Sequence, residues 1–231
     1  MSSYSGVEIA NRFFEGTGRS YDLIVNLCTM GFDLWWKERL LRKVPAKPSR
    51  IVDQACGTGI LTFKLARRFP SCRVTGVELR DEYLDLARAK AKALKLSNVD
   101  FVLGRAEEVV VQGPVDCIVS SYLAKYAELR SLVGNAGTML RRGGTLVMHD
   151  FTYPGGNLFP KLWKLYFKML QSAGAACFPE WKTVFFELPG FLGRTRWVSE
   201  TLAELRGNRF GRIRYAPLTW GASAIISAVK A

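Results

Sequence analysis

Residues 50–62 read Arg50-Ile51-Val52-Asp53-Gln54-Ala55-Cys56-Gly57-Thr58-Gly59-Ile60-Leu61-Thr62. Apolar residues close a predicted buried strand here, and the two glycines then let the backbone turn and pass close to a ligand. The residues from 62 to 69 have the apolar spacing of a helix. A second short strand, residues 73–78, ends in the carboxylate of Glu78, about where a dinucleotide-type fold places its ribose-binding acid. Together the two segments predict a cofactor site on an α/β sheet.

The order of the glycines narrows the kind of cofactor. Nicotinamide and flavin sites use G-x-G-x-x-G, and a P-loop carries Lys-Ser/Thr after its last glycine; this chain has neither. Here Asp53 comes first, and Ala55, Gly57 and Gly59 follow at alternate positions. That order resembles motif I of the class I S-adenosylmethionine (SAM) methyltransferases, in which the acid meets the ligand's ammonium side and the glycines pass beneath its methionine part. The alternative, a strand-turn-helix with incidental glycines, is disfavoured by the position of Glu78.

The composition fits one globular domain in a reducing compartment. At 231 residues and 25.9 kDa the chain can bury one sizeable core. We divide that domain into a helical cap (1–49), a cofactor-binding core (50–150), a substrate lid region (151–200) and a C-terminal hairpin (201–231). The five cysteines are scattered and lack a C-x-x-C pair, so neither a disulfide framework nor a zinc site is indicated. No signal peptide or membrane span is recognised, so the expected location is the cytoplasm, with any membrane contact peripheral.

The net charge of +13 and the pI near 9.8 are the unusual global properties of this chain. Such an excess of positive charge attracts nucleic acid, anionic lipid or acidic substrates and cannot choose among them. The basic residues are spread along the chain, without an arginine-rich run or an aromatic-interleaved basic motif. No dedicated nucleic-acid module is therefore predicted.

Strand and helix signals alternate after residue 50, which predicts an α/β fold with a doubly wound, Rossmann-like, mostly parallel sheet. Helices are expected at 81–96, with Leu94 pointing inward, and at 129–140, ended by Gly143-Gly144. An antiparallel hairpin is expected at the sheet edge. The predicted strands are 50–53, 73–78, 99–103, 115–120 and 145–149, followed by the hairpin strands 213–215 and 222–229.

In an open α/β sheet the ligand binds outside the carboxyl ends of the strands, so each strand end is a candidate part of the site. The ends at 53–59, 78–80 and 104–107 are expected to hold the cofactor. The ends at 120–125 and 149–154 are expected to face the group that is methylated.

From Phe14 to the C-terminus the chain resembles the ubiquinone/menaquinone biosynthesis C-methyltransferases (UbiE/MenG-type). The residues that carry this resemblance are Tyr21-Asp22-Leu23, Gly31, Trp36-Lys37, Ala55-Cys56-Gly57-Thr58-Gly59, Gly143-Gly144-Thr145-Leu146-Val147 and Leu218-Thr219-Trp220-Gly221. The resemblance implies a SAM-dependent enzyme with a helical N-terminal cap and a quinol acceptor. The residues expected to contact SAM are Tyr21, Asp53, Ala55, Gly57, Gly59, Glu78, Leu79, Arg105, Ala106 and Ser120.

The chain departs from that family at three strand ends. Gly104-Arg105-Ala106-Glu107 replaces a Gly-Asp-Ala-Glu run, so the carboxylate expected near the adenine amino group is missing and adenine recognition falls to backbone and Leu79. Tyr122-Leu123-Ala124-Lys125 stands in place of Gly-Leu-Arg-Asn, whose arginine is implicated in quinol methylation. His149-Asp150-Phe151-Thr152-Tyr153-Pro154 replaces Glu-Phe-Ser-Lys-Pro, which keeps an acid and adds a histidine.

Methylating a ring carbon of a hydroquinone requires a base that removes the hydroxyl proton. His149 is the only histidine and stands at a strand end that should face the site. Side chains alternate along a strand, so His149 can instead be packed beneath a helix, in which case Asp150 faces the site. Tyr122 and Tyr153 are secondary candidates, and each can equally be an aromatic wall.

Residues 157–170 carry apolar side chains over most of a helical circumference, with Lys161, Lys164 and Lys168 on one narrow stripe. Such a helix can lie on anionic lipid or close over a lipid-tailed substrate. It can also simply pack on the sheet with its lysines solvated. Its position after the fifth strand favours a lid over the substrate.

These observations predict a SAM-dependent methyltransferase acting on a small lipophilic aromatic acceptor, a prenylated quinol being the first choice. Phospholipid N-methylation on phosphatidylethanolamine uses the same fold, a basic surface and an apolar lid. An RNA methyltransferase is supported by charge alone. A SAM-binding accessory protein without activity is the alternative outside enzymology, because the family arginine is absent and Arg105 replaces a carboxylate. The oligomeric state is left open, with a homodimer as one option.

Overall fold

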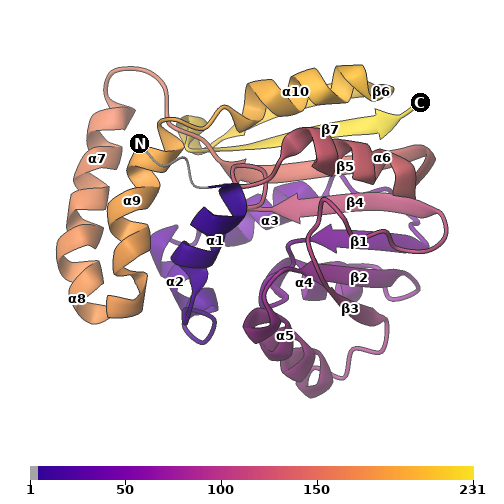
Figure 1. Cartoon of the computed structure of the whole chain (residues 1–231), viewed down its shortest axis with the longest axis horizontal. Helices are drawn as coiled ribbons and strands as arrows, with labels where there is room; N and C mark the ends of the chain where they lie inside the picture. Colours follow the sequence, from indigo (N-terminus) through magenta and orange to yellow (C-terminus); the bar gives the residue numbers. More distant parts are fainter. Residues whose placement is uncertain (1–4) are drawn as a thin grey trace.

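The computed structural model describes residues 5–231 as one seven-stranded sheet with helices on both faces (Figure 1). The strand order is β3-β2-β1-β4-β5-β7-β6, and β7 runs antiparallel to both of its neighbours. This confirms the predicted doubly wound α/β fold with a C-terminal hairpin. The strands are β1 (Arg50–Gln54), β2 (Arg73–Glu78), β3 (Val99–Leu103), β4 (Val115–Ser121), β5 (Leu140–Phe151), β6 (Phe210–Leu218) and β7 (Ser223–Lys230).

Two apolar layers cover the sheet. On one face α3 (Phe32–Leu41) and α4 (Ile60–Arg68) bury side chains such as Trp36 and Leu65, and α5 (Asp81–Ala93) packs beside α4. On the other face α6 (Leu129–Met139) and α10 (Trp197–Gly207) pack on each other and on the sheet. The order of the chain reverses between β1 and β4, so the carboxyl ends of these two strands flank the crevice where such folds bind ligands.

A helical cap lies over the carboxyl ends of the parallel strands, at the left of Figure 1. It consists of α1 (Gly6–Phe14), α2 (Tyr21–Cys28), α7 (Phe159–Met169), α8 (Ala175–Cys177) and α9 (Lys182–Leu192), with a π-helical turn at Leu170–Gly174 and a 3-10 turn at Pro179–Trp181. Aromatic side chains from both ends of the chain, including Phe13 and Trp181, bury a common core in this cap. The N-terminal segment and the predicted lid therefore form one structural unit.

Two local predictions were wrong. Gly143 and Gly144 do not end a helix; they lie inside β5, where the pairing with β4 shifts register and Gly143 takes φ +75°. Leu94 follows the end of α5 and is 41% exposed instead of buried. The sequence also did not predict α10, which fills the sheet face beside α6. None of the helices in residues 5–231 has the length and apolar character needed to cross a membrane.

Candidate cofactor and substrate site

The loop between β1 and α4 holds three residues in left-handed backbone conformation. Gly57 has φ +59° and Gly59 has φ +92°, and Ala55 takes φ +58° even though it carries a side chain. A Cβ on Gly59 would lie 2.4 Å from the ring of Phe63 in α4, so the space behind this glycine is already filled by protein. The loop is thus held in one shape from behind, and its backbone is free to approach a ligand from the front.

Glu78 closes the neighbouring strand and faces the same loop. One carboxylate oxygen accepts the backbone N–H of Gly57 at 2.9 Å and the other accepts the N–H of Arg80 at 3.0 Å. The side chain is 7% exposed, and burial raises its pKa. Since each oxygen can accept a further hydrogen bond, this carboxylate suits the ribose hydroxyls of a nucleoside.

Asp53 lies beneath the loop rather than on its open side. Its carboxylate is 1% exposed and accepts a hydrogen bond from the Thr62 hydroxyl at 2.6 Å, which ties β1 to α4. Burial raises the pKa of Asp53 to about 7, against the lowering effects of Thr62 and Lys37. The structure thus places this predicted ligand residue where its hydrogen bond with Thr62 supports the glycine loop.

We expect the protonation of Asp53 to make stability depend on pH. The folded state keeps this proton up to a pH of about 7, whereas the ordinary pKa of an aspartate side chain is 3.8. The folded protein therefore binds more protons between these limits, and stability falls as pH rises through this window. Relative to Asp53→Asn, the wild type should lose on the order of 1 kcal/mol per pH unit, measured by urea unfolding from pH 4 to 8. Parallel pH curves for the two proteins would contradict this assignment.

A small cavity of about 50 Å³ adjoins the loop on the side of β3. Leu79, Arg105, Ala106 and Ala55, all of them predicted cofactor contacts, line this cavity, and so does Glu107. The Glu107 side chain is 7% exposed, so a carboxylate faces this cavity although the one expected at position 105 is missing. Glu107 can thus take part in adenine recognition. The sequence analysis included it in the strand end at 104–107 that was expected to hold the cofactor, but assigned it no specific role.

Helix α1 covers this small cavity with Val7 and Ala10. It is held there by Arg80, whose guanidinium donates to Asn11 Oδ1 at 3.0 Å, and by an ion pair from Arg12 to Glu187 of α9. That α1 covers this cavity could not be predicted from the sequence, because an amphipathic pattern predicts a helix with one buried face and not the surface against which that face packs.

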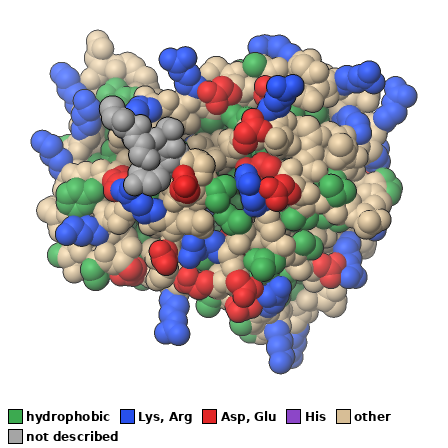
Figure 2. Space-filling view, viewed as in Figure 1, with side chains coloured by type: hydrophobic (Ala, Val, Ile, Leu, Met, Phe, Trp, Pro, Cys, Tyr) green, Lys and Arg blue, Asp and Glu red, His purple; other side chains and the backbone are tan. Residues whose placement is uncertain are grey.

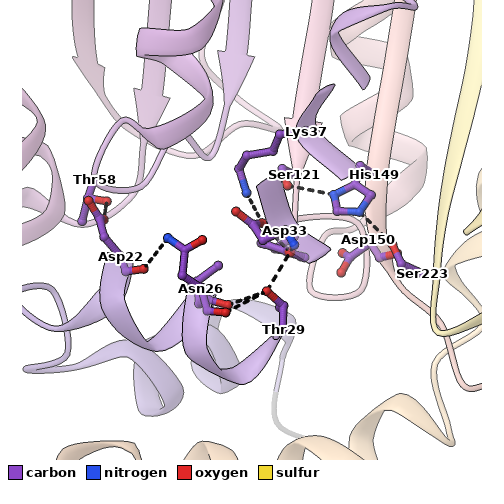
Figure 3. Close-up of polar contacts among 12 residues, drawn as sticks. Asp22, Asn26, Thr29, Asp33, Lys37, Thr58, Ser121, His149, Asp150 and Ser223 are labelled. Atoms are coloured by element: carbon purple, nitrogen blue, oxygen red, sulfur yellow. Dashed lines mark hydrogen bonds and ion pairs between the residues drawn. The ribbon is translucent and has the colours of Figure 1, made fainter. Parts of the chain in front are cut away.

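Helix α2 is joined to the glycine loop by polar contacts (Figure 3). The Asp22 carboxylate accepts hydrogen bonds from the Thr58 hydroxyl and from Lys90 Nζ, the latter at 2.6 Å. These contacts set the ring of Tyr21 next to the loop, where a Cβ on Gly57 would lie 4.0 Å from it. Tyr21 therefore lies where the resemblance predicted a cofactor contact.

Two buried polar atoms at the crevice have no partner within residues 5–231. They are Ser120 Oγ of β4 and Gln54 Oε1 of β1, which occupy paired positions of adjacent strands. Buried polar atoms are rarely left unpaired unless a ligand or water completes them. With the Glu78 carboxylate and the left-handed loop, this set of acceptors fits a ligand that brings hydroxyl and ammonium donors, as SAM does.

A larger cavity of about 310 Å³ lies between the sheet edge and the cap. Its walls are almost entirely apolar and aromatic, with Phe14, Phe151 and Trp181 among them. Tyr126 lines both this cavity and the smaller one, so the two spaces meet at its side chain. The hydroxyls of Tyr21 and Tyr126 make no hydrogen bond within the described residues, which leaves them available to a bound molecule.

Among residues 5–231, Lys125 is the single basic residue in the wall of the larger cavity. Its Nζ lies 2.6 Å from Asp150 Oδ1, and both side chains are at most 1% exposed. The ammonium also lies 4.4 Å from the Tyr126 ring centroid and 5.3 Å from that of Tyr122. Burial lowers the pKa of Lys125 and raises that of Asp150, while their mutual attraction opposes both shifts. The opposite directions of the two shifts bring the pKa values of the pair toward each other.

Tyr122 also lines the cavity and takes a left-handed φ of +69°. Its hydroxyl donates to Asp33 Oδ1 at 2.7 Å, and its ring stacks on Phe151 with centroids 4.6 Å apart. Burial and the nearby Asp33 raise its pKa, so it stays protonated and acts as an aromatic wall. Tyr153 lies outside the cavity wall and packs on Trp163.

His149 does not line the cavity. It is fully buried, and both ring nitrogens are occupied, Nδ1 by the Ser121 hydroxyl at 2.9 Å and Nε2 by the Ser223 hydroxyl at 2.7 Å (Figure 3). Burial, with Lys37 and Lys125 nearby, lowers its pKa well below 6.5. Of the two neighbours on β5, strand alternation thus directs Asp150 toward the Lys125 side of the cavity and His149 toward α3.

Comparison with known proteins agrees with this geometry. Residues 51–144 match the family described as "Methyltransferase domain". A demethylmenaquinone methyltransferase of Deinococcus radiodurans is 26% identical over 93% of this chain and 89% of its own length. One of Thermus thermophilus is 29% identical over 89% of this chain and 94% of its own. The fold matches the solved geranyl diphosphate C-methyltransferase of Streptomyces coelicolor, with TM-score 0.62, 15% identity, and coverage of 86% of this chain and 79% of that chain.

Proposed function

We propose that this chain, a class I SAM-dependent methyltransferase related to the demethylmenaquinone methyltransferases, methylates a ring carbon of a prenylated quinol. The observation that carries the proposal is the buried pair of Lys125 and Asp150 in the wall of an otherwise apolar, aromatic cavity. Aromatic walls suit a planar ring, and one cationic group suits a ring hydroxyl that becomes a phenolate.

The sign of the charge in the cavity wall separates quinol from amine acceptors. Lys125 lines the cavity, whereas Asp150, which pairs with Lys125 Nζ, is absent from the wall. A phenolate gains from an adjacent ammonium in a poorly solvated space, and an ammonium acceptor loses by the same interaction. This disfavours phosphatidylethanolamine as the acceptor, because its head group is cationic near neutral pH.

SAM supplies an electrophilic methyl group on a sulfonium sulfur. The protein positions the acceptor ring, excludes water and removes the hydroxyl proton. In the proposed step Lys125 gives one Nζ proton to Asp150 Oδ1 and takes the proton of the ring hydroxyl. The O–H bond of the acceptor breaks, an N–H bond forms, and Lys125 ends as an ammonium beside the phenolate. The electron pair left on oxygen would be delocalised onto a ring carbon, which makes that carbon nucleophilic toward the methyl group that SAM would supply.

Single-turnover transfer of labelled methyl from SAM to extracted bacterial lipids tests the proposal. We expect label in the quinone fraction only, with transfer requiring a reduced quinol because an oxidised quinone has no hydroxyl proton to lose. Label in the phospholipid fraction or in added RNA would replace the proposal with one of those substrates. A protein that binds S-adenosylhomocysteine but labels no fraction would be the accessory protein instead.

A further inference from the structure

The mouth of the larger cavity is built from side chains that are exposed and apolar. Met30 is 71% exposed, Trp220 is 68% exposed and Leu162 of α7 is 50% exposed, and all three line the cavity. Met30 and Trp220 also border a shallow groove that continues outward to Trp35 of α3. Apolar surface therefore runs without interruption from the inside of the cavity onto the outside of the protein.

Exposed apolar side chains are concentrated around this mouth. Of the sixteen large apolar side chains that are exposed in the described residues, ten belong to α7 or the residue just before it, to the segment from α2 to α3, or to the turn at Thr219–Gly221. We name these ten the mouth ring: Leu23, Leu27, Met30, Leu34, Trp35, Leu158, Leu162, Leu165, Met169 and Trp220. Tyr166 of α7 donates to the Cys28 carbonyl at 2.6 Å, which holds the two sides of the ring together. A concentration of exposed apolar side chains at one place on a protein surface marks an interaction surface.

The backbone at Trp220 is strained in a way that keeps its indole outside. Thr219 and Trp220 have φ +44° and +52°, a conformation that bulky residues rarely adopt. The turn is fixed by Trp36, whose indole N–H donates to Thr219 Oγ1 at 2.7 Å, and by Phe159, which stacks on Trp220 with centroids 5.0 Å apart. An exposed tryptophan held by a strained turn suits the interface between water and lipid, where amphipathic rings are favoured.

Basic residues accompany the apolar stripe of α7. Lys161, Lys164 and Lys168 are exposed and each lies one position before a member of the mouth ring, and residues 157–174 contain no acid. Figure 2 shows blue side chains beside green ones along the edge where α7 and α8 lie. Apolar side chains flanked by lysines fit a surface with an apolar interior and anionic head groups.

We propose that the mouth ring docks on an anionic phospholipid bilayer and that the acceptor enters the cavity directly from the lipid. The cavity volume of about 310 Å³ is near the lower limit for small-molecule sites, about 300 Å³, so a long prenyl tail extends out through the mouth. The lysine edge favours a bilayer over an apolar protein partner. This inference deepens the proposed function, because it gives the route by which a lipophilic acceptor arrives. Vesicle binding is measured without an acceptor, so the two proposals are tested independently. The protein can fail to bind vesicles and still methylate a quinol, or it can bind vesicles and methylate no quinol.

Co-sedimentation with vesicles of phosphatidylglycerol and phosphatidylcholine tests the docking. Met30→Ser/Leu165→Ser/Trp220→Ser should lower the partition coefficient at least about tenfold, because three apolar side chains no longer leave water. The matched control is Leu94→Ser/Val110→Ser/Tyr215→Ser, which changes three exposed apolar side chains outside the mouth ring and should stay within about twofold of wild type. Both variants should bind S-adenosylhomocysteine as the wild type does.

The lysines are tested separately. Lys161→Ala/Lys164→Ala/Lys168→Ala should lower binding to these vesicles on the order of a hundredfold at low salt, and the difference should shrink as salt rises. Equal losses in the mouth-ring and control variants, or no binding of wild type to anionic vesicles at low salt, would overturn the proposal. If the wild type instead forms a dimer that the mouth-ring variant abolishes, the patch serves self-association.

Discussion

Gly59→Val should abolish measurable binding of S-adenosylhomocysteine, with a loss of at least about a hundredfold in affinity. Gly59 has φ +92°, where a β-branched residue is strongly disfavoured. A Cβ there would lie 2.4 Å from the Phe63 ring, which is itself buried against α5. Neither group can yield without moving the loop, so the backbone that approaches the cofactor is displaced. Isothermal titration calorimetry measures the effect.

A second glycine variant distinguishes the effect of backbone strain from the effect of the position of Gly59 in the cofactor loop. Gly143 also has positive φ, +75°, but it lies in the bulge of β5, and a Cβ there would meet only an Arg141 nitrogen at 3.7 Å. Gly143→Val should therefore share the backbone strain and keep cofactor affinity. Removing the obstructing ring in Gly59→Ala/Phe63→Ala should restore part of the binding lost in Gly59→Ala. Wild-type affinity in a folded Gly59→Val protein would show that the loop does not contact the cofactor.

The features that the sequence predicted well depend on neighbouring residues. The glycine loop follows β1 directly, and Glu78 ends a strand whose bounds agree with the prediction. In a parallel sheet the carboxyl ends of the strands lie at one edge, where the ligand binds. Predicting where each strand ends therefore also predicts which segments form the site. This is why the segments that carry Glu78, Leu79 and Arg105 could be placed at one edge of the sheet without a structure.

Features that depend on distant contacts were beyond the sequence. Whether His149 or Asp150 faces the acceptor depends on which layer covers each face of β5, and α3 and the loop at Lys125 come from distant parts of the chain. The pairing of Lys125 with Asp150 requires β4 and β5 to be neighbours, a fact about topology rather than spacing. The closing of the cap likewise depends on contacts of α1 and α2 with segments more than 150 residues away. In each case the residue was visible in the sequence and its partner was not.

Lys125→Met should lower the single-turnover rate of methyl transfer by about two to four powers of ten, the usual contribution of general acid–base catalysis. Methionine keeps much of the apolar stem that packs between Tyr122 and Tyr126 but cannot relay a proton. Asp150→Asn should produce a loss of similar size, because Lys125 then has no acceptor for its proton. Cofactor affinity should change little in either variant, since neither residue lines the small nucleoside cavity.

Breaking a buried ion pair also costs stability, about 3–5 kcal/mol, so the rate must be compared with a variant that carries the same cost. Lys37→Met is that control: Lys37 pairs with Asp33, its side chain is 4% exposed, and it is absent from the cavity wall. It should be destabilised to a similar extent while keeping most of the rate per folded molecule. His149→Asn should also keep most of the rate and leave the shape of its pH profile unchanged, because burial lowers the pKa of His149 well below 6.5. If His149→Asn lost most of the transfer rate while Lys125→Met transferred methyl at nearly the wild-type rate, His149 would be the base and Lys125 would have no part in the reaction.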